Sequence, residues 1–357
     1  MLFRSGSIRL DLTEIRSLLG ATKAIITRPR QLRWHYRSRD ERLIGFSNDR
    51  IYKSLITFPH SDSLSPISHV LVDQFPDNVT SKATNKAEVR SVVELVKSHA
   101  SHSPEDSLGV IALGKPHADA ILDAVERERD ADPDLAAFLD STDSDPFFVK
   151  NLERVQGDER DSIILSIGYG RRDDGSLNYT FGPVNGEDGY RRLNVATTRA
   201  KSRMTVVSTF KGEEMIESRC QGGTLFLRDY LIYARSGGLI LGRADNSAPP
   251  LNPFEKSIQR ALEAEGLELV PQHGVGRFRI DFAVRHPSDP GRFVLAVECD
   301  GASYHSYPTA RDRDRLRQQI LESRGWRFHR IWSTDWFRNP EDEVQRVLES
   351  YHAAISH

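Results

Sequence analysis

Cysteine and long apolar segments are both scarce in this sequence. Only Cys220 and Cys299 occur among its 357 residues, and neither has a second cysteine or a histidine beside it at metal-ligand spacing. A disulfide framework and a structural zinc site are therefore not expected. There is also no apolar run of about 20 residues and no secretory pattern at the start, so we expect a cytoplasmic protein without a membrane helix.

The chain has little excess charge of either sign, with 49 lysines and arginines against 51 aspartates and glutamates. No overall field therefore attracts the protein to a polyanion, and any contact with a nucleic acid must come from local patches. At 357 residues the chain is long enough for two domains with separate cores.

A phosphate-binding loop of the form G-x-x-x-x-G-K-S/T is also missing. The segment GVIALGKPH comes nearest, but it lacks the Ser or Thr that binds Mg²⁺ in that motif. No Asp-Glu metal-binding motif precedes residue 32 either. We therefore expect no ATP hydrolysis by this chain alone.

Hydrophobic patterns divide the sequence into two α/β regions. From about residue 85, helical stretches alternate with short β-rich runs, which favours a mostly parallel sheet. A segment rich in Gly, Ser, Asn and Pro then indicates a linker. Beyond it, helix and strand patterns predict a small α/β/α unit. We predict a connecting segment at 1–31, an α/β domain at 32–235, a linker at 236–252 and a second domain at 253–357.

Three acidic residues lie in register on two predicted strands of the second domain. In RFRIDFAVRH, Asp281 leaves the more apolar face of the strand, and in FVLAVECDG, Glu298 and Asp300 point the same way. If the strands pair as a hairpin, Asp281 lies beside Glu298. A simpler alternative is an exposed hairpin whose carboxylates face water.

Such a carboxylate cluster on an otherwise hydrophobic sheet is costly without a partner. A hard divalent cation such as Mg²⁺, or Mn²⁺, relieves the repulsion, supplies a nucleophilic water and stabilises charge on a phosphate. Phosphodiester hydrolysis is the chemistry that fits this pattern.

The second domain resembles PD-(D/E)xK nucleases related to very-short-patch repair endonucleases. The resemblance covers nearly all of residues 253–337 and rests on FEKSIQRALEAEG, RFRIDFAV, VLAVECDGASYH and RDRDRLRQQILESRGWRFHRIW. It implies a restriction-endonuclease-like α/β/α fold in which Asp281 and Glu298 bind the metal. Glu255 then matches an acidic residue of the leading helix, and Asp300 and His305 match a DG…H extension.

The sequence departs from that family's pattern at one position. The usual Lys two residues after the second carboxylate is replaced by Asp300. Arg313 and Arg317, four residues apart on the following helix, are the candidates for its positive charge.

Two of the implied site residues have alternative interpretations. Asn252, Pro253 and Glu255 also form a helix start in which Glu255 completes a capping box. His305 is either a general base or donor to phosphate, or a solvated loop histidine.

The first domain resembles the second RecA-like domain of superfamily 1 helicases, without its ATP-binding partner. Residues 32–52, 155–168 and 191–201 are similar to motifs IV, V and VI of that family, in the same order. The last two segments, with Gln-Gly-x-Glu before an apolar strand and RRLNVATTRAK, carry most of the specificity.

This resemblance implies roles for several residues of the first domain. Arg199 matches the arginine finger and Arg37 a second γ-phosphate contact. The residues that would line the nucleotide or DNA cleft are Gln156, Gly157 and Glu159. Arg192 and Arg199 lie two helical turns apart, so both are expected on one side of a helix. The alternative is that these arginines form ordinary surface salt bridges.

Together these features predict an Mg²⁺-dependent DNA endonuclease attached to a partial helicase motor, in DNA repair or defence. Two alternatives remain open. The chain is a non-catalytic DNA-binding remnant, or it is a helicase subunit completed in trans by a separate chain with the phosphate loop. In every case DNA is the expected partner, and residues 251–357 are expected to fold independently.

Overall fold

The computed structural model describes residues 33–61, 65–73, 79–80, 84–141, 145–171, 175–186, 188–239, 250–274, 279–301 and 308–356. Within them lie two sheets and a short hairpin of β2 (Val79–Thr80) and β3 (Thr84–Asn85). His305 lies outside the described residues, and so does the side chain of Arg313, whose backbone belongs to a helix.

The larger sheet is entirely parallel, with the strand order β1-β7-β6-β4-β5. Its strands are β1 (Ile67–Leu71), β4 (Leu108–Ala112), β5 (Phe148–Asn151), β6 (Arg160–Ser166) and β7 (Ala200–Ser208). Strands β4 and β6 are buried almost throughout, as strands covered by helices on both faces must be. The predicted RecA-like parallel sheet is confirmed.

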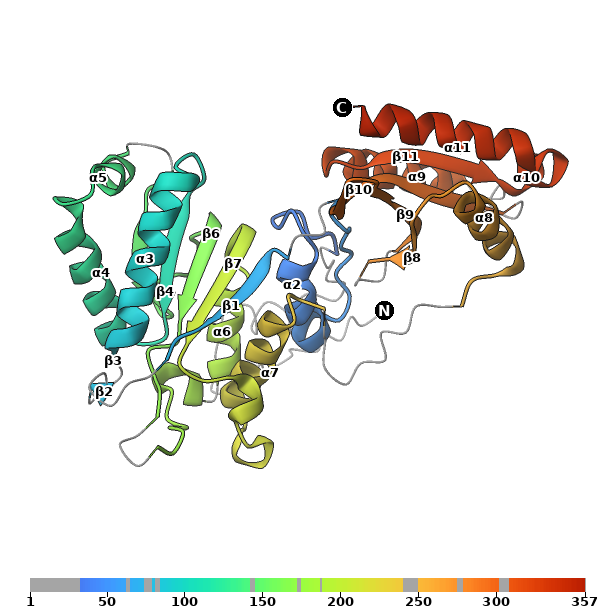
Figure 1. Cartoon of the computed structure of the whole chain (residues 1–357). Helices are drawn as coiled ribbons and strands as arrows, with labels where there is room; N and C mark the ends of the chain where they lie inside the picture. The colour runs from blue at the N-terminus through green and yellow to red at the C-terminus, as the bar shows by residue number, and fades with distance from the viewer. Residues whose placement is uncertain are drawn as a thin grey trace, which may run out of the picture. The chain divides into compact units, whose positions relative to one another are not determined.

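Helices cover both faces of this sheet (Figure 1). The α-helices are α2 (Arg42–Ser47), α3 (Lys86–His102), α4 (Lys115–Arg129), α5 (Pro133–Leu139), α6 (Gly189–Thr197) and α7 (Gly223–Arg235). Short π and 3-10 turns are η2 (Asn48–Tyr52), η4 (Gly182–Asn185), η5 (Gly212–Glu214) and η6 (Glu217–Arg219). Helix α3 begins where the Asn85 side chain accepts hydrogen bonds from the backbone amides of Ala87 and Glu88.

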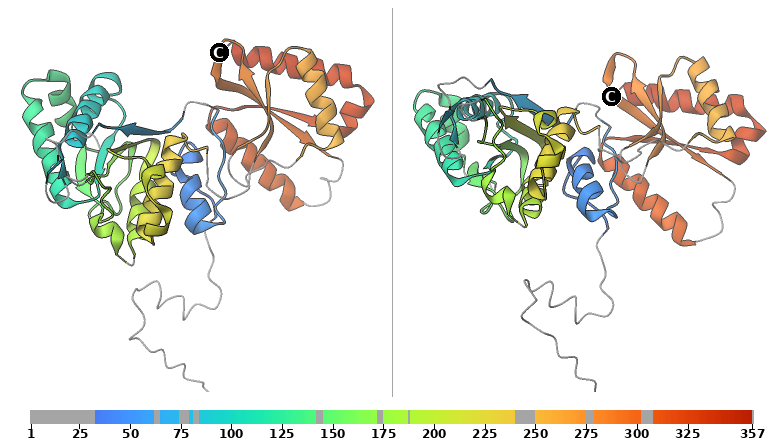
Figure 2. Two further views of the ribbon diagram at one scale, coloured as in Figure 1. Left: turned by 60° about the horizontal axis from the view of Figure 1, so that its bottom comes forward. Right: turned by 90° about the horizontal axis from the view of Figure 1, so that it is seen from below.

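Strand β6 shows how the sheet divides its side chains between two cores. Ile163 and Leu165 pack with residues of α2, α6 and α7. Ile164 packs on the opposite face with residues of α3 and α4. The period of two along a strand therefore produces the three layers that the further views in Figure 2 also show.

The smaller sheet has the order β11-β10-β9-β8, with β10 parallel to β11 and the other neighbours antiparallel. Its strands are β8 (Leu269–His273), β9 (Ile280–His286), β10 (Asp289–Asp300) and β11 (Arg327–Trp332). The helices around it are α8 (Pro253–Ala264), α9 (Pro308–Ser323), α10 (Ser333–Arg338) and α11 (Pro340–Ile355). Residues of α8, α10 and α11 pack on one face and residues of α9 on the other, which confirms the restriction-endonuclease-like α/β/α arrangement.

A buried polar cluster lies where β6 ends. The Glu88 Oε2 atom accepts hydrogen bonds from the Ser166 hydroxyl at 2.8 Å and from the Gly168 amide at 2.7 Å. The His117 Nε2 atom lies 2.8 Å from the Ser166 hydroxyl oxygen. Glu88, His117 and Ser166 are fully buried, and burial raises the pKa of Glu88 to about 8.

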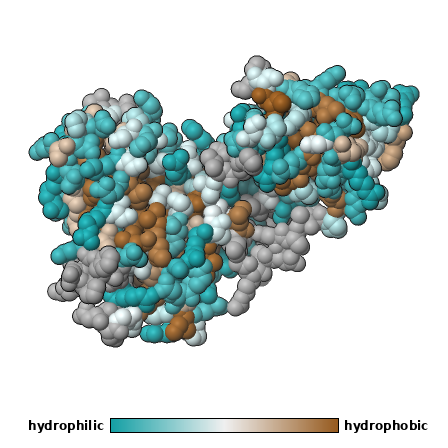
Figure 3. Space-filling view, viewed as in Figure 1, coloured by the Kyte–Doolittle hydropathy of each residue, from teal (hydrophilic) through white to brown (hydrophobic). Residues whose placement is uncertain are grey.

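The described surface is mainly hydrophilic. In Figure 3 hydrophobic residues form separate patches among hydrophilic ones. Large exposed apolar side chains among the described residues, such as Leu239 and Phe337, are few. Among the described residues, no helix has both the length and the apolar character needed to cross a membrane.

Candidate functional site

The two central carboxylates of the smaller sheet lie on neighbouring antiparallel strands. Val297 of β10 pairs with Phe282 of β9, so one residue further along the ladder Glu298 stands opposite Asp281. Phe282 and Val297 are fully buried, which anchors this register because a slip of one residue would turn them out of the core. The predicted proximity of Asp281 and Glu298 is confirmed.

Each carboxylate is held by specific donors. The Asp281 Oδ2 atom accepts a hydrogen bond of 2.8 Å from the Cys299 backbone amide. Its Oδ1 atom accepts a longer one, of 3.4 Å, from the Gln272 side chain. The Glu298 Oε1 atom accepts a hydrogen bond of 2.8 Å from Nη2 of Arg317, which extends from α9. One of the two predicted basic residues of α9 therefore reaches the carboxylate pair.

The surroundings of this pair disfavour negative charge. Burial raises the pKa of Glu298 to about 8, Arg317 opposes the rise, and Asp281 and Asp300 add to it. Burial also raises the pKa of Asp281, against the Cys299 amide bond and the attraction of Arg317. Raised pKa values of this kind in buried carboxyl groups are typical of functional sites.

Asp300 occupies the position of the usual lysine and is itself paired. Its Oδ2 atom lies 3.0 Å from Nε of Arg330, which the neighbouring β11 presents. Asp300 therefore contributes to the negative field around Glu298 while its own charge is balanced locally.

Two residues around the cluster were not predicted from the sequence to lie there. Arg330 stands opposite Glu298 only because β11 runs parallel to β10. Gln272, one residue before the end of β8, has a left-handed conformation, with φ of +50°, and its side chain donates to Asp281. A non-glycine residue in that region is strained, and such strain is concentrated at functional sites.

Glu255 completes a capping box at the start of α8. The Asn252 side chain accepts a hydrogen bond of 2.9 Å from the Glu255 amide, and the Glu255 carboxylate accepts one of 2.8 Å from the Asn252 amide. The capping interpretation is confirmed. Burial, the largest cause, and the charge of Asp281 both raise the pKa of Glu255, so its carboxyl also faces the cluster.

The Glu255→Gln substitution separates the two roles of this residue. Glutamine completes a capping box as glutamate does, so we expect an unchanged melting temperature. If Glu255 supports only the helix, any nuclease activity of the chain is expected to stay within about twofold of the original, since such a change lies well below one kcal/mol. A tenfold loss of that activity at an unchanged melting temperature would instead give Glu255 a role in the carboxylate cluster.

Asp281 and Glu298 alone supply fewer ligands than a complete metal site needs. Among the residues that the structure describes, no group of three or more His, Cys, Asp or Glu side chains is placed to hold a metal ion. Asp281 and Glu298 nevertheless offer the hard oxygen ligands that Mg²⁺ prefers.

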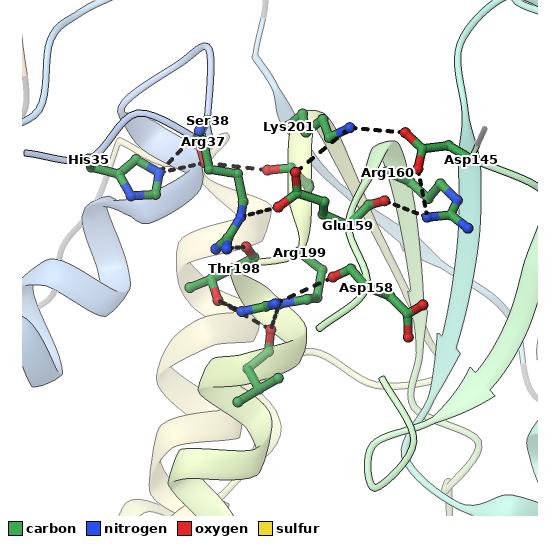
Figure 4. A network of polar contacts seen from close by, with 12 residues as sticks. His35, Arg37, Ser38, Asp145, Asp158, Glu159, Arg160, Thr198, Arg199 and Lys201 are labelled. Atoms are coloured by element: carbon green, nitrogen blue, oxygen red, sulfur yellow. Dashed lines mark hydrogen bonds and ion pairs between the residues drawn. The ribbon is translucent and has the colours of Figure 1, made fainter. Parts of the chain in front are cut away.

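A second polar network lies at the amino ends of β6 and β7 (Figure 4). Arg37 Nε donates a hydrogen bond of 2.6 Å to Oε2 of Glu159, and Lys201 Nζ lies 3.8 Å from the other oxygen of that carboxylate. Arg37 Nη1 also contacts the Thr198 carbonyl at 3.4 Å. Arg37 and Glu159, both singled out from the sequence, are therefore direct partners.

Arg199 belongs to the same network. Its Nε atom donates to the Val195 carbonyl at 2.8 Å, and its Nη1 atom to the Asp158 carbonyl at 3.3 Å. Burial, followed by repulsion from Arg37, lowers the pKa of the Arg199 guanidinium. Two positive side chains that face each other in this way favour an anion as a further partner.

The expectation that Arg192 and Arg199 share one face of a helix is wrong. Helix α6 ends at Thr197, and Arg199 lies in the turn before β7. The Thr198 hydroxyl donates to the carbonyls of Asn194 and Val195, which competes with continuation of the helix. Arg192 is exposed and contacts the Pro183 carbonyl at 3.2 Å, apart from the network.

Gln156 and Gly157 are exposed in the turn before Glu159. Gly157 has φ of +95°, a conformation that favours glycine. Both residues precede Glu159 in the sequence by two or three positions, and their exposure leaves them accessible to a ligand.

Comparison with known proteins agrees with this two-part architecture. The family model REase_MTES_1575, of restriction-endonuclease type, matches residues 254–350. A helicase-type AAA domain model, AAA_12, matches residues 16–211.

Two curated relatives are named as uncharacterized ATP-dependent helicases. The MG140 homolog of Mycoplasma pneumoniae is 29% identical over 335 residues, which cover 88% of this chain and 29% of the relative. MG140 of Mycoplasma genitalium is 29% identical over 338 residues, which cover 89% and 29%. The chain thus spans less than a third of the length of these relatives.

Two solved structures are each similar to a part of the chain. The catalytic domain of the homing endonuclease I-Bth0305I matches 29% of this chain and 99% of its own, with 18% identity and a TM-score of 0.24. The C-terminal domain of a possible DNA helicase from Lactobacillus plantarum WCFS1 matches 48% and 86%, with 16% identity and a TM-score of 0.27. Since the AAA domain model takes in more than half of the residues, this chain belongs to the AAA_12 family of AAA domains, joined here to a restriction-endonuclease-like domain.

Proposed function

We propose that this chain cleaves DNA at the Asp281–Glu298 pair with the help of a divalent cation, Mg²⁺ or Mn²⁺. The observation that carries the proposal is the placement of two largely buried carboxylates side by side on an otherwise apolar sheet. Such an arrangement is costly unless positive charge compensates it. The match to a restriction-endonuclease-type family supports the same chemistry. A role in DNA repair or defence belongs to this proposal.

Asp281 and Glu298 would hold the cation through their carboxylate oxygens, and Glu255 is the candidate for further support. When bound, the cation activates a water molecule and stabilises negative charge on the phosphate. The Cys299 amide fixes the orientation of Asp281. His305 and Arg313 keep the roles that the family resemblance implies.

Arg317 takes the place of the missing lysine in this proposal. Its guanidinium neutralises Glu298 in the structure, at 2.8 Å. With a cation held by Glu298, the Arg317 guanidinium would be able to donate hydrogen bonds to a phosphate oxygen of the DNA. Asp300, held by Arg330, does not compete for the cation.

A plasmid-nicking assay of the chain, with and without added Mg²⁺ or Mn²⁺, tests the proposal. We expect nicked and linear products that require the cation and vanish with excess chelator. Protein that binds DNA but leaves it intact with either cation would reject DNA cleavage.

The Arg317→Gln substitution is expected to slow cleavage roughly a hundredfold, because a preorganised positive donor to the phosphate is lost. Arg317→Lys should recover part of the rate, since it restores the charge but not the forked geometry. Arg315→Gln, at an exposed position of the same helix, is the matched control. Equal rates for the Arg315 and Arg317 variants would remove Arg317 from the site.

A non-catalytic DNA-binding role is the second candidate. The ion pairs Arg317–Glu298 and Arg330–Asp300 favour it, because they balance two of the carboxylates without a metal. The nicking assay distinguishes the two, since this candidate predicts DNA binding and no product under every metal condition.

The motor half fits a nucleotide-dependent role when the first helicase domain is supplied, in the same chain or by a separate one. Arg37 and Arg199 lie close together around Glu159, where an anionic phosphate would be attracted. The curated relatives are named ATP-dependent helicases, which supports ATP as that ligand. These arginines only stabilise a transition state that other residues have positioned.

A further inference from the structure

The second face of the smaller sheet is completed by a residue from a distant part of the sequence. Phe58 is 2% exposed and packs in the same apolar cluster as residues of β9, β10, α9 and the turn after α9. The partners in this cluster are Ile280, Ala283, Phe293, Ala296, Leu321 and Trp326. Phe58 precedes every strand of the larger sheet, so the restriction-endonuclease-like core is not built from residues 253–357 alone.

Backbone carbonyls of Phe58 and its neighbours accept hydrogen bonds from residues of the restriction-endonuclease-like domain. The Trp326 indole N–H donates a buried hydrogen bond of 3.0 Å to the Pro59 carbonyl. The Phe293 amide donates one of 2.8 Å to the Ser61 carbonyl. Arg324 Nη1 donates one of 2.9 Å to the Phe58 carbonyl. These three contacts, to the carbonyls of Phe58, Pro59 and Ser61, make the segment Ile56–Ser61 an additional layer on the sheet.

The turn after α9 is shaped for this segment. Gly325 has φ of +86°, and a Cβ atom there would lie 2.7 Å from the Ser61 hydroxyl. The Ser61 hydroxyl also donates to the Arg324 carbonyl at 3.3 Å. A residue with a side chain at position 325 would therefore be strained and would push Ser61 away.

The same segment is tied to the polar network of the larger sheet. Arg324 Nη1 donates a second hydrogen bond, of 2.8 Å, to the Arg39 carbonyl. The Arg39 amide in turn donates to the Lys201 carbonyl at 2.7 Å. Arg37, two residues earlier, forms the ion pair with Glu159. The Arg324 guanidinium thus joins the turn after α9 to the irregular segment that carries Arg37.

We propose that the segment Ile56–Ser61 is a structural component of the restriction-endonuclease-like unit and couples it to the helicase-type unit. Residues 35–357 then fold as one cooperative body, in line with their single compact unit of contacts. This proposal replaces the expectation that residues 251–357 fold independently. It holds whether or not the chain cleaves DNA.

The test uses the whole chain with a specific protease site inserted between residues 242 and 247. After cleavage, the two fragments are expected to elute together in size-exclusion chromatography and to unfold in a single thermal transition. Wild-type fragments that separate, with a C-terminal fragment that keeps the melting temperature of the intact chain, would overturn the proposal.

Three variants of the cleavable chain sharpen this test. Phe58→Ala is expected to weaken association of the fragments roughly a hundredfold or more, because it empties a buried aromatic site. Trp326→Phe keeps the ring but loses the indole donor, so its fragments should separate at a lower temperature than those of the wild type. Phe337→Ala removes a phenylalanine that is 71% exposed and should leave association unchanged. Equal association in all three variants would also contradict the proposal.

Discussion

Replacing either central carboxylate by its amide, Asp281→Asn or Glu298→Gln, is expected to reduce metal-dependent nicking of plasmid DNA by about a thousandfold or more. Each substitution keeps the shape of the side chain but removes a negative oxygen ligand, so cation affinity and water activation both fall. In the asparagine variant, the side-chain carbonyl can still accept the hydrogen bond from the Cys299 backbone amide, which preserves the local backbone.

Stability should not follow activity in these variants. Burial raises the pKa of both carboxyl groups, which means that their ionised forms destabilise the fold at neutral pH. We therefore expect apo melting temperatures that are unchanged or slightly higher. Structural carboxylates would give the opposite result, lower melting temperatures with no stabilisation by Mg²⁺.

Thermal melts with and without Mg²⁺, run beside the nicking assay, measure both quantities. Glu265→Gln, at an exposed position of the same domain, is the control. Nicking by the Glu298→Gln protein at the wild-type rate would remove this pair from the active site.

The Glu88→Gln substitution is expected to abolish a large pH dependence of stability. Burial raises the pKa of Glu88 from 4.5 in the unfolded chain to about 8 in the folded protein. The folded state therefore binds this proton more tightly, and stability falls as the pH rises from 4.5 through 8. The difference of pKa corresponds to a loss of about 5 kcal/mol above pH 8.

Glutamine resembles the protonated acid and can still accept the bonds from Ser166 and Gly168. The free energy of unfolding, from urea titrations at pH 5 and pH 8.5, should therefore shift in favour of the variant by several kcal/mol between the two conditions. Burial lowers the pKa of the neighbouring His117 to about 4, so its own contribution to stability rises with pH up to about 6.5, opposite in direction to that of Glu88. Glu94→Gln, exposed on the same helix, is the control. A difference that stays constant with pH would contradict the assignment.

The carboxylate pair could be predicted because it depends on strand periodicity alone. Alternation of apolar and acidic residues in β9 and β10 places Asp281 and Glu298 on one face, and the hairpin brings them together. Strands β4, β6 and β7 of the larger sheet and β9, β10 and β11 of the smaller one were likewise predicted from β-rich runs, whereas β1, β5 and β8 were not. Contacts that depend on the packing of separate elements could not be predicted. The positions of Arg330 and Gln272 beside the carboxylates are contacts of this kind.

Two further differences have local physical causes. The sequence RRLNVATTRAK favours a continuous helix, but side-chain hydroxyl bonds at Thr197 and Thr198 and the pairing of β7 with β6 end it before Arg199. Phe58 lies in TFPHSDS, which has no periodicity of its own, so nothing local predicts its burial against a sheet more than 200 residues away in sequence.

The parallel pairing of β10 with β11 has a consequence for how this site can change during evolution. Parallel neighbours need a crossover connection, and here α9 lies in that crossover and carries Arg317 across to Glu298. The acidic and the basic side chains of the cluster therefore stand on separate elements. The hairpin of β9 and β10 carries Asp281 and Glu298, and the crossover helix α9 carries Arg317. A change at position 300 of the strand can therefore leave the positive charge of Arg317 beside Glu298 in place.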